Sequence, residues 1–409
     1  MLFQELPNDR AVLPLLLYIQ ERLGFWGDRT TRVRHPVAFV AFWITVAIPK
    51  LATDYSDVES FICSMAELAF VGNVFCGGMA LWSVYDAFRQ FIEQVIRLTK
   101  YLYRYHHPLQ TVREQLLQFN RLVHRHINRY CFFILILIMF YLVAPVITSF
   151  GVYFQSIWQS YHLANGTVRT WNISEEVPCR QFSLHMEQDF YGLQHRTNIL
   201  HYTLYIAVIV PMMFTTACTV HVKVLTIACS VRYAEMLLQI VILKLDNLHR
   251  MPNQKSIREE LHDIIHVHQR TLDCIALLVQ ALRPILMVQL VFCVFIWCLM
   301  MLFFTIADKL SVTFVNLAIL FVVITIETFS ACYFGTRLST QAVELSKSVY
   351  GCGWPAMDRD IQQGLRMVLH RTQSPVGIQA GKFCFVDVEL FQNMVNKSYS
   401  FFIVLKDAF

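Results

Sequence analysis

Charged residues are scarce in this chain. Asp, Glu, Lys and Arg make up 15% of its 409 residues, and 56% of the residues are hydrophobic. Soluble domains carry about 25% charged residues, so the composition excludes an ordinary water-soluble domain. The 34 basic residues nearly balance the 29 acidic ones, and a net charge of +5 argues against nucleic-acid binding.

The motifs of common enzymes are also missing. The sequence has no glycine-rich phosphate loop, no G-x-S-x-G and no H-E-x-x-H. We therefore expect no catalytic residues and no cofactor. Two histidine pairs, His124/His126 and His266/His268, have i,i+2 spacing, which puts the two rings on different helix faces. We expect solvated cytosolic histidines there and no metal site.

Cysteine usage gives no sign of a disulfide framework. Most of the twelve cysteines lie inside apolar runs, there is no C-x-x-C, and only Cys179 falls clearly in an outer loop. The short apolar run 12–19 follows two acidic residues and precedes no small-residue cleavage site. It is therefore not predicted to be a signal peptide.

Long runs of apolar residues are the main feature of the sequence. A helix needs about 20 apolar residues to cross a bilayer. The sequence predicts seven such spans, at about 35–52, 60–86, 130–158, 197–223, 284–307, 311–336 and 383–406. Residues 34–409 would thus form a transmembrane domain, and residues 1–33 a cytosolic segment with one helix lying on the inner leaflet.

The number of Lys and Arg residues alternates between high and low in successive connecting segments. The amino-terminal segment has five, and segments 86–129, 223–283 and 337–382 have eight, eight and six, whereas 159–196 has three. By the positive-inside rule the amino terminus is cytosolic, and seven spans place the carboxyl terminus outside. Two sequons, at Asn165 and Asn172, fall in the predicted outer loop and are candidate glycosylation sites.

This orientation excludes G-protein-coupled receptors, whose seven spans run the opposite way. Asn128-Arg129-Tyr130 is similar to their Asp-Arg-Tyr motif, but here it precedes a span on the cytosolic side. The apolar residues of the cytosolic segments recur at helical spacing, for example at Leu261, Ile264 and His268. We expect the segments 87–129, 224–283 and 337–382 to form a cytosolic helical anchor.

A few charged residues lie inside the spans. Glu67 and Glu327 are costly in hydrocarbon unless they face protein or water, so each has either a structural hydrogen bond or a ligand-facing role. Lys50, near the end of the first span, is expected to snorkel to the membrane surface. The last span is the most polar, and a wet face on one helix suggests several copies around an axis, hence an oligomeric channel.

Aromatic residues gather at a comparable depth in the outer half of spans two, three, four and six. With one glycine that makes room, they suit a small, mostly apolar ligand, although simple helix packing is the alternative. The candidate ligand-binding residues are Glu67, Phe70, Val71, Ile147, Phe150, Gly151, Phe154, Tyr202, Tyr205, Ile206 and Phe321.

The carboxyl-terminal region resembles insect odorant receptors. The similar positions are Tyr350, Trp354, Leu365-Arg366-Met367, Arg371, Ala380-Gly381-Lys382-Phe383, Phe391 and Ser398-Tyr399-Ser400-Phe401-Phe402. The Gly-Lys-Phe, the later Phe and the Ser-Tyr-Ser-Phe-Phe ending carry the resemblance. The rest of the chain is similar in architecture and length.

The resemblance implies an odorant-gated, non-selective cation channel built as a tetramer. This chain would be the odorant-binding subunit, because its loop between spans four and five is much shorter than that of the odorant receptor co-receptor (Orco). Small volatiles, membrane lipid and permeating cations would be its other partners. The resemblance implies inter-subunit contacts at Tyr350, Trp354, Leu365, Phe383 and Phe391, and a pore lined by Ser398, Phe402, Leu405 and Lys406.

Two alternatives remain from the sequence. A gustatory receptor would share the fold but end in a Thr-Tyr-hydrophobic-Gln-Phe signature, which is absent here. A secondary transporter would show inverted repeats with broken helices. Pro145, Gly151 and Pro211 could break helices, but no repeat accompanies them. The predicted fold is an all-α membrane protein with seven transmembrane helices, a cytosolic anchor and an oligomeric channel.

Overall fold

Twelve labelled α-helices make up most of the described chain. The structure, a computed structural model, describes residues 6, 8–55, 57–104, 110–165, 182–186, 188–251, 253–307, 312–381 and 384–408. The helices are α1 (Pro14–Leu23), α2 (Arg29–Arg32), α3 (Arg34–Phe42), α4 (Ile48–Ala52), α5 (Val58–Ser83), α6 (Tyr85–Arg104), α7 (Gln110–Asn165), α8 (Ile199–Asp246), α9 (Gln254–Ile306), α10 (Val312–Gly351), α11 (Arg359–Thr372) and α12 (Val388–Ala408). Shorter elements are the π-helix η1 (Trp43–Ala47), the 3₁₀ turns η2 (Leu248–Arg250) and η3 (Trp354–Ala356), and the strands β1 (Gln379–Ala380) and β2 (Cys384–Phe385).

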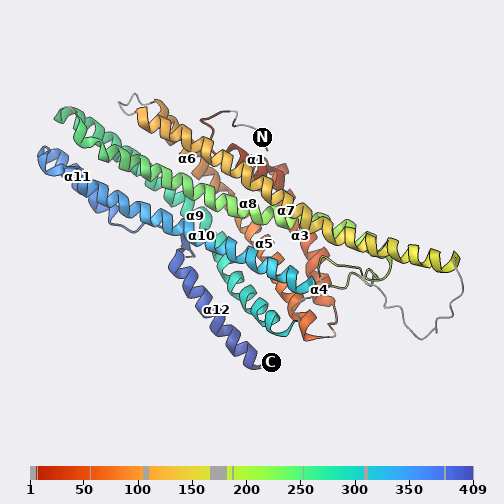
Figure 1. The fold of residues 1–409 in the computed structure, drawn as a ribbon. Helices are drawn as coiled ribbons and strands as arrows, with labels where there is room; N and C mark the ends of the chain where they lie inside the picture. Colours follow the sequence, from red (N-terminus) through yellow and green to blue (C-terminus); the bar gives the residue numbers. More distant parts are fainter. Residues whose placement is uncertain are drawn as a thin grey trace.

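Four helices are far longer than a bilayer requires. α7, α8, α9 and α10 have 56, 48, 53 and 40 residues, whereas about 20 span the hydrocarbon. In these four helices the predicted span therefore continues without a break into the cytosolic region. Figure 1 shows these helices running side by side, with α6 and α11 beside their cytosolic parts. The prediction that the cytosolic segments are helical is confirmed.

α5 lies at the centre of the membrane-spanning part. Its most apolar window is 78% buried, whereas that of α7 is only 11% buried. α5 packs against α9, α8 and α3, and α8 packs along α10. The exposed apolar surface of α7 is the surface expected of a helix that faces lipid, because hydrocarbon surrounds apolar side chains as well as protein does.

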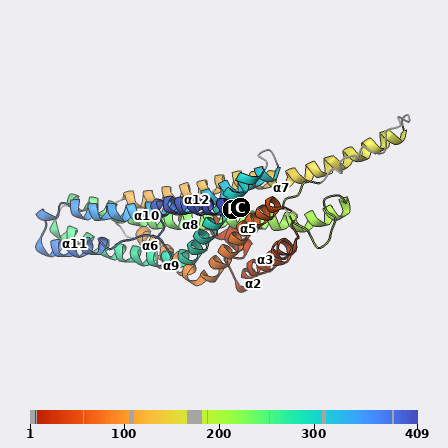
Figure 2. The same ribbon diagram turned by 90° about the horizontal axis from the view of Figure 1, so that it is seen from below.

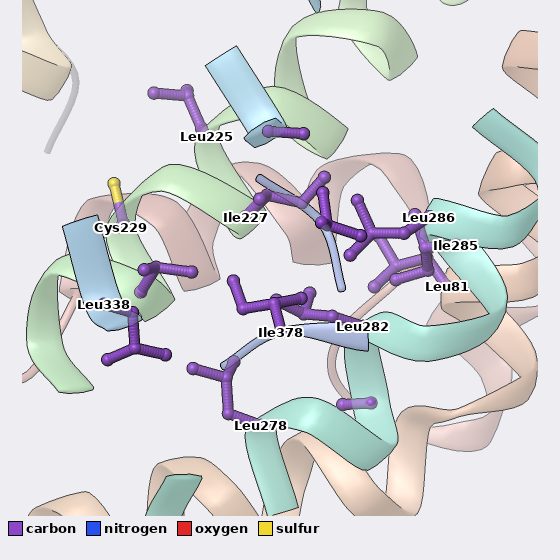
Figure 3. Close-up of a cluster of buried hydrophobic side chains, with 14 of the residues drawn as sticks. Leu81, Leu225, Ile227, Cys229, Leu278, Leu282, Ile285, Leu286, Leu338 and Ile378 are labelled. Carbon is purple, nitrogen blue, oxygen red and sulfur yellow. The ribbon is translucent and has the colours of Figure 1, made fainter. Parts of the chain in front are cut away.

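A compact apolar cluster joins the membrane-spanning helices to the cytosolic ones (Figure 3). It combines Leu81 of α5, Leu225 of α8, Leu282 of α9 and Leu338 of α10 with Ile378, which directly precedes β1. Each fully buried side chain of this size stabilises the fold by about 1.5–3 kcal/mol. The cluster therefore fixes the relative positions of α5, α8, α9 and α10.

The amino-terminal helix α1 belongs to the protein core. Leu15 and Leu16 are buried, and the Gln20 amide donates to Thr226 Oγ1 of α8 over 2.7 Å. α1 therefore packs on the cytosolic end of the bundle in addition to any contact with lipid.

The last helix is preceded by a small antiparallel hairpin, in which β1 pairs with β2. The predicted seventh span began at residue 383, but α12 begins at Val388. The Asp387 carboxylate accepts from the backbone N–H of Leu390 over 2.7 Å, so it caps the helix start. Six helices of the described chain are long and apolar enough to span a membrane on composition, and α12 is not among them. Its polarity agrees with the wet face predicted for the last span.

Candidate ligand site and buried polar networks

Two predicted ligand residues, Tyr202 and Tyr205 on α8, lie together under the outer loop. We call residues 182–186 and 188–198 the outer loop segment. The ring of Phe182 in this segment lies tilted against Tyr202 with ring centroids 5.0 Å apart, and His195 stacks on Tyr205 at 4.7 Å. The predicted Phe150 approaches Tyr202 edge-on at 6.3 Å. The structure therefore brings Phe150, Tyr202 and Tyr205 into an aromatic cluster, and their contact with a ligand stays a prediction.

The hydroxyls of the two tyrosines hold the backbone of the outer loop segment. Tyr202 donates to the carbonyl of Ser183 and Tyr205 donates to the carbonyl of Met186, each over 3.3 Å. Phe190 packs on the Tyr205 ring at 5.5 Å. The sequence predicted an outer loop over residues 159–196 but not its packing on these tyrosines, because the loop has neither helical nor strand periodicity. Its several aromatic residues and histidines were the available signal.

The first span also anchors the outer loop segment. Pro49 has no N–H and cannot bond the carbonyl of Thr45, four residues earlier. The Gln188 amide donates to this carbonyl over 3.3 Å, and the Tyr191 hydroxyl donates to the neighbouring Ile44 carbonyl over 2.6 Å. Both acceptors lie in the π-helix η1. The outer loop segment therefore supplies hydrogen-bond donors to backbone carbonyls of an irregular helix inside the first span.

His185 connects this segment to α7 through a titratable side chain. Its Nε2 lies 2.9 Å from the carbonyl oxygen of Leu142, and burial lowers the pKa of the imidazole below its usual value. Because the folded pKa is depressed, this stabilisation is complete above the unfolded pKa of about 6.5 and is lost as the pH falls through the folded pKa.

We therefore expect a several-fold faster protease cleavage of the outer loop segment at pH 5.0 than at pH 7.5. Limited proteolysis of purified receptor measures this. His185→Gln keeps an N–H donor without titrating, so its cleavage rate should change less with pH. Equal pH dependence in both proteins would contradict the assignment to His185.

The other predicted ligand residues divide into two groups. Phe70 and Val71 of α5 are buried, Ile206 is half-buried, and Phe321 contacts the Phe304 ring at 5.7 Å. On α7, by contrast, Ile147, Gly151 and Phe154 recur at i, i+4 and i+7 on the outward face. Ile147 and Phe154 are each 65% exposed, and nothing lies within 4 Å of a Cβ built on Gly151. The structure does not bring these three residues to the aromatic cluster.

Glu67 forms a buried ion pair with Lys50. The Lys50 ammonium lies 2.7 Å from Glu67 Oε2 and 3.2 Å from Ser64 Oγ, and the side chain of Lys50 is 0% exposed. The prediction that Lys50 snorkels is therefore wrong, because a carboxylate inside the bundle offers it a closer partner than the membrane surface. The structural alternative for Glu67 is the one observed.

Glu327 likewise has a lysine partner. Lys223 of α8 lies 2.9 Å from Glu327 Oε1 of α10, and both side chains are buried. Gln289 of α9 accepts from Asn73 of α5 over 3.1 Å and donates to Thr328 over 3.1 Å. Lys223 Nζ also lies 3.4 Å from Gln289 Oε1. This polar network therefore ties four spans together.

Gly77 makes room for the lysine of this network. A Cβ at residue 77 would lie 3.0 Å from Lys223 Nζ and 3.1 Å from its Cδ. Both distances are shorter than ordinary van der Waals contact, so a larger residue at position 77 would require the lysine to move by a few tenths of an ångström. The two buried pairs thus neutralise Glu67 and Glu327, the acidic residues that the sequence places inside the second and sixth spans.

The predicted pore residues do not share one face of α12. Ser398 is 1% exposed, and its carbonyl accepts from Cys298 Sγ of α9 over 3.5 Å. Phe402 is half-buried, whereas Lys406 is exposed, and the side chain of Leu405 lies outside the described residues. The position of Ser398 argues against a pore-lining role, because the chain's own α9 covers it.

Three predicted subunit contacts lie together at the cytosolic end. Tyr350, Trp354 and Leu365 line a cavity of about 90 Å³ between α10, η3 and α11. Phe391 instead packs inside the chain, with ring centroids 5.6 Å from Trp297 and 5.3 Å from Phe329. Phe383 and Asn172 lie outside the described residues, and Asn165 is the last residue of α7. The use of the sequons stays a prediction.

The prediction of solvated cytosolic histidines is wrong for His124 and His268, which are both buried. Burial lowers the pKa of His268 to about 4, and the nearby Arg371 acts in the same direction. Both histidines lie where long cytosolic helices pack on one another, which the i,i+2 spacing alone does not reveal. Among the described residues no group of three His, Cys, Asp or Glu side chains could hold a metal ion.

The long apolar helices, the buried ion pairs and the lipid-facing surface of α7 define a multi-span α-helical membrane protein. Residues 65–399 match the family model described as 7tm odorant receptor. The chain therefore belongs to the odorant receptor family, and it is a multi-pass protein of the cell membrane.

Individual relatives agree with this membership. The chain is 32% identical over 154 residues to odorant receptor 2a of Drosophila melanogaster, covering 35% of this chain and 39% of that protein. It is 23% identical over 195 residues to odorant receptor 94a of the same species, covering 47% and 50%. The chain thus spans half or less of the length of these curated relatives.

A solved structure matches over nearly the whole fold. The olfactory receptor OR5 from Machilis hrabei, determined in complex with eugenol, matches with a TM-score of 0.70 at 12% identity. The match covers 97% of each chain. At this identity the similarity shows the fold.

Proposed function

We propose that this chain is the odorant-binding subunit of a heteromeric, odorant-gated, non-selective cation channel. It would assemble with the odorant receptor co-receptor (Orco) in a mixed tetramer. The proposed odorant binding is supported by the aromatic cluster of Tyr202, Tyr205 and Phe150 under the outer loop segment. Aromatic faces with a few hydroxyls recognise small, mostly apolar compounds, such as volatile odorants.

The site would hold its ligand between α5, α8 and the outer loop segment. Phe70, Val71 and Tyr205 contribute buried apolar surface, and the Tyr205 hydroxyl bonds the backbone of Met186. A ligand that binds one arrangement of this segment more tightly than another shifts the population towards it. The contacts of the segment with α7, α8 and η1 provide the path by which occupancy changes helix positions.

The proposed assembly with other subunits is supported by exposed side chains at the cytosolic end of the bundle. Tyr350 is 69% exposed and Met367 is 68% exposed, beside the cavity lined by Trp354 and Leu365. Exposed aromatic and methionine side chains outside the bilayer favour a protein partner, since they are enriched at interfaces. We infer that neighbouring subunits contact this end.

The test is whole-cell current in cells that express this chain with or without the co-receptor, during a panel of small heterocyclic and aromatic volatiles. We expect a rapid inward current only when both subunits are present. Tyr205→Ala should shift the effective odorant concentration at least tenfold, whereas Phe154→Ala, on the outward face of α7, should not.

Current from this chain alone would contradict the heteromer. A slow signal that depends on G proteins would contradict the channel. Equal effects of the two alanine substitutions would contradict the location of the ligand at the aromatic cluster.

A further inference from the structure

The loop after α11 contains the only Ser-Pro or Thr-Pro dipeptide of the 409 residues, Ser374-Pro375. Arg371 lies three residues before the serine. The loop belongs to the segment 337–382, which the distribution of Lys and Arg places in the cytosol, where ATP and protein kinases are present. Figures 1 and 2 both show α11 lying along the cytosolic part of α10.

The Ser374 side chain is accessible in this loop. Ser374 and Pro375 are both exposed, and no hydrogen bond joins Ser374 Oγ to another described residue. Proline disfavours helical backbone in the residue before it, so α11 ends at Thr372 and the loop continues without regular structure. A kinase must place the hydroxyl in line with the γ-phosphate of ATP, which requires an exposed serine outside a packed helix. Tyr350 and Trp354, the predicted subunit contacts, precede α11, so they lie at the opposite end of this helix.

Thr372, two residues earlier, is held within the fold. Its Oγ1 donates to the carbonyl of Leu369 over 2.8 Å and accepts from Ser346 Oγ of α10 over 2.9 Å. The side chain is half-buried in the last turn of α11. Thr372 therefore offers a hydroxyl close in sequence to Ser374 that is not accessible to a kinase.

Ser374 also lines a cavity that reaches the start of α12. The cavity has a volume of about 360 Å³, and Gly335 of α10, Val386 and Asp387 line it as well. A sphere of this volume is about 9 Å across, close to the Debye length of about 8 Å in physiological salt. A charge on Ser374 would therefore be only partly screened from the Asp387 carboxylate, which caps α12 by accepting from the N–H of Leu390.

We propose that Ser374 is phosphorylated by a proline-directed protein kinase and that the phosphate weakens the contact of this loop with the start of α12. Ser374 Oγ forms a bond to the γ-phosphorus of ATP, the bond from that phosphorus to the β,γ-bridging oxygen breaks, and ADP leaves. The hydroxyl proton passes to the catalytic base of the kinase.

The charge of the phosphate gives the direction of the effect. A phosphoserine carries about −1.5 to −2 charges at pH 7, so the Asp387 carboxylate repels it. Arg371 is exposed in the last turn of α11 and does not line the cavity. Pairing with Arg371 therefore draws the phosphate away from α12. The loop then no longer supports the first turn of α12 beside α10.

The first experiment measures the modification itself. Purified full-length receptor is incubated with an active proline-directed kinase and radiolabelled ATP, and the phosphate bound per chain is measured. We expect Ser374→Ala and Pro375→Ala to bind at least tenfold less phosphate than the parent, whereas Thr372→Val, the matched control, should bind as much. Equal labelling of the parent and Ser374→Ala, or no labelling of the parent, would overturn the assignment of Ser374.

The second experiment measures odorant-evoked current per surface receptor in cells that also express the co-receptor. Ser374→Glu places a fixed negative charge in the loop, and Ser374→Gln has the same size without the charge. We expect about threefold less current from Ser374→Glu and parental current from Ser374→Gln, because the charge acts on the loop. Asn caps a helix as well as Asp does, so the double variant Ser374→Glu/Asp387→Asn should recover the current.

Equal loss from Ser374→Glu and Ser374→Gln, or no recovery in the double variant, would overturn the repulsion by Asp387. The effect on current rests on the proposed channel function, whereas phosphorylation of Ser374 does not. Absence of odorant current from the parental pair would count against the proposed function, and phosphate labelling of the purified receptor would still decide whether Ser374 is modified.

Discussion

Replacing Glu327 with glutamine will remove most of this receptor from the cell surface. Glu327 is the partner of Lys223 over 2.9 Å, and both side chains are at most 4% exposed. The substitution leaves a buried ammonium without its counter-charge, which costs about 3–5 kcal/mol. A fold that is stable by about 5–15 kcal/mol loses a large part of its stability in this way.

Surface biotinylation of parental and variant receptor measures the effect, and we expect at least a fivefold loss. The double variant Lys223→Met/Glu327→Leu removes both charges, so it should recover most of the lost surface protein. The matched control is Glu344→Gln, whose pair with Lys347 spans 2.8 Å but lies on the surface. That pair contributes about 0–1 kcal/mol, and its loss should be undetectable. A normal surface level of Glu327→Gln would show that the ion pair does not hold the fold.

The spans and their direction were predictable from the sequence because both depend on local properties. Hydropathy over about 20 residues identifies a span, and counts of Lys and Arg in adjacent segments set its direction. Helical spacing around Leu261 and Ile264 also predicted the cytosolic helices. The sequence did not predict that α7 to α10 each run from the membrane-spanning part into the cytosolic part without a break. The composition changes at the membrane surface, but the helical backbone conformation does not.

The partners of the buried charges could not be predicted in the same way. The cost of Glu67 and Glu327 in hydrocarbon is evident from one residue, but their lysines come from other helices and depend on packing. Lys50 shows the consequence, since its position near a span end favoured snorkelling on local grounds. The covered face of α12 has the same origin, because polar residues occur on most sides of this helix and only its contacts with α9 and α10 identify the inward one.

Gly335→Ala will disconnect the last helix from α10. A Cβ on Gly335 would overlap the carbonyl oxygen of Val386, which is backbone and cannot rotate away. Val386 is fixed by its N–H, which donates to the Ile378 carbonyl over 2.9 Å, and two residues later the N–H of Val388 donates to Thr336 Oγ1 over 2.9 Å. The start of α12 therefore contacts α10 directly through the backbone.

Alanine favours a helix over glycine by about 0.8–1 kcal/mol, so on propensity alone the substitution would stabilise α10. Forcing two backbones apart costs more than that, about 3 kcal/mol here, at the upper end of typical overpacking. We therefore expect a lower Tm of the purified receptor and a loss of odorant-evoked current at matched surface level. Gly351→Ala is the matched control, since Gly351 also lies in α10 and a Cβ there would meet no atom within 4 Å.

The comparison of these two glycines separates stability from coupling. If Gly335→Ala lowered Tm but left the current per surface receptor unchanged, the contact would serve folding only. If both variants behaved as the parent does, α10 and the hairpin would be free to move apart at no cost. Loss of current with Gly335→Ala alone would mean that the contact of α12 with α10 couples the proposed ligand site to the proposed pore, because this backbone contact joins the start of α12 to one of the long helices of the bundle.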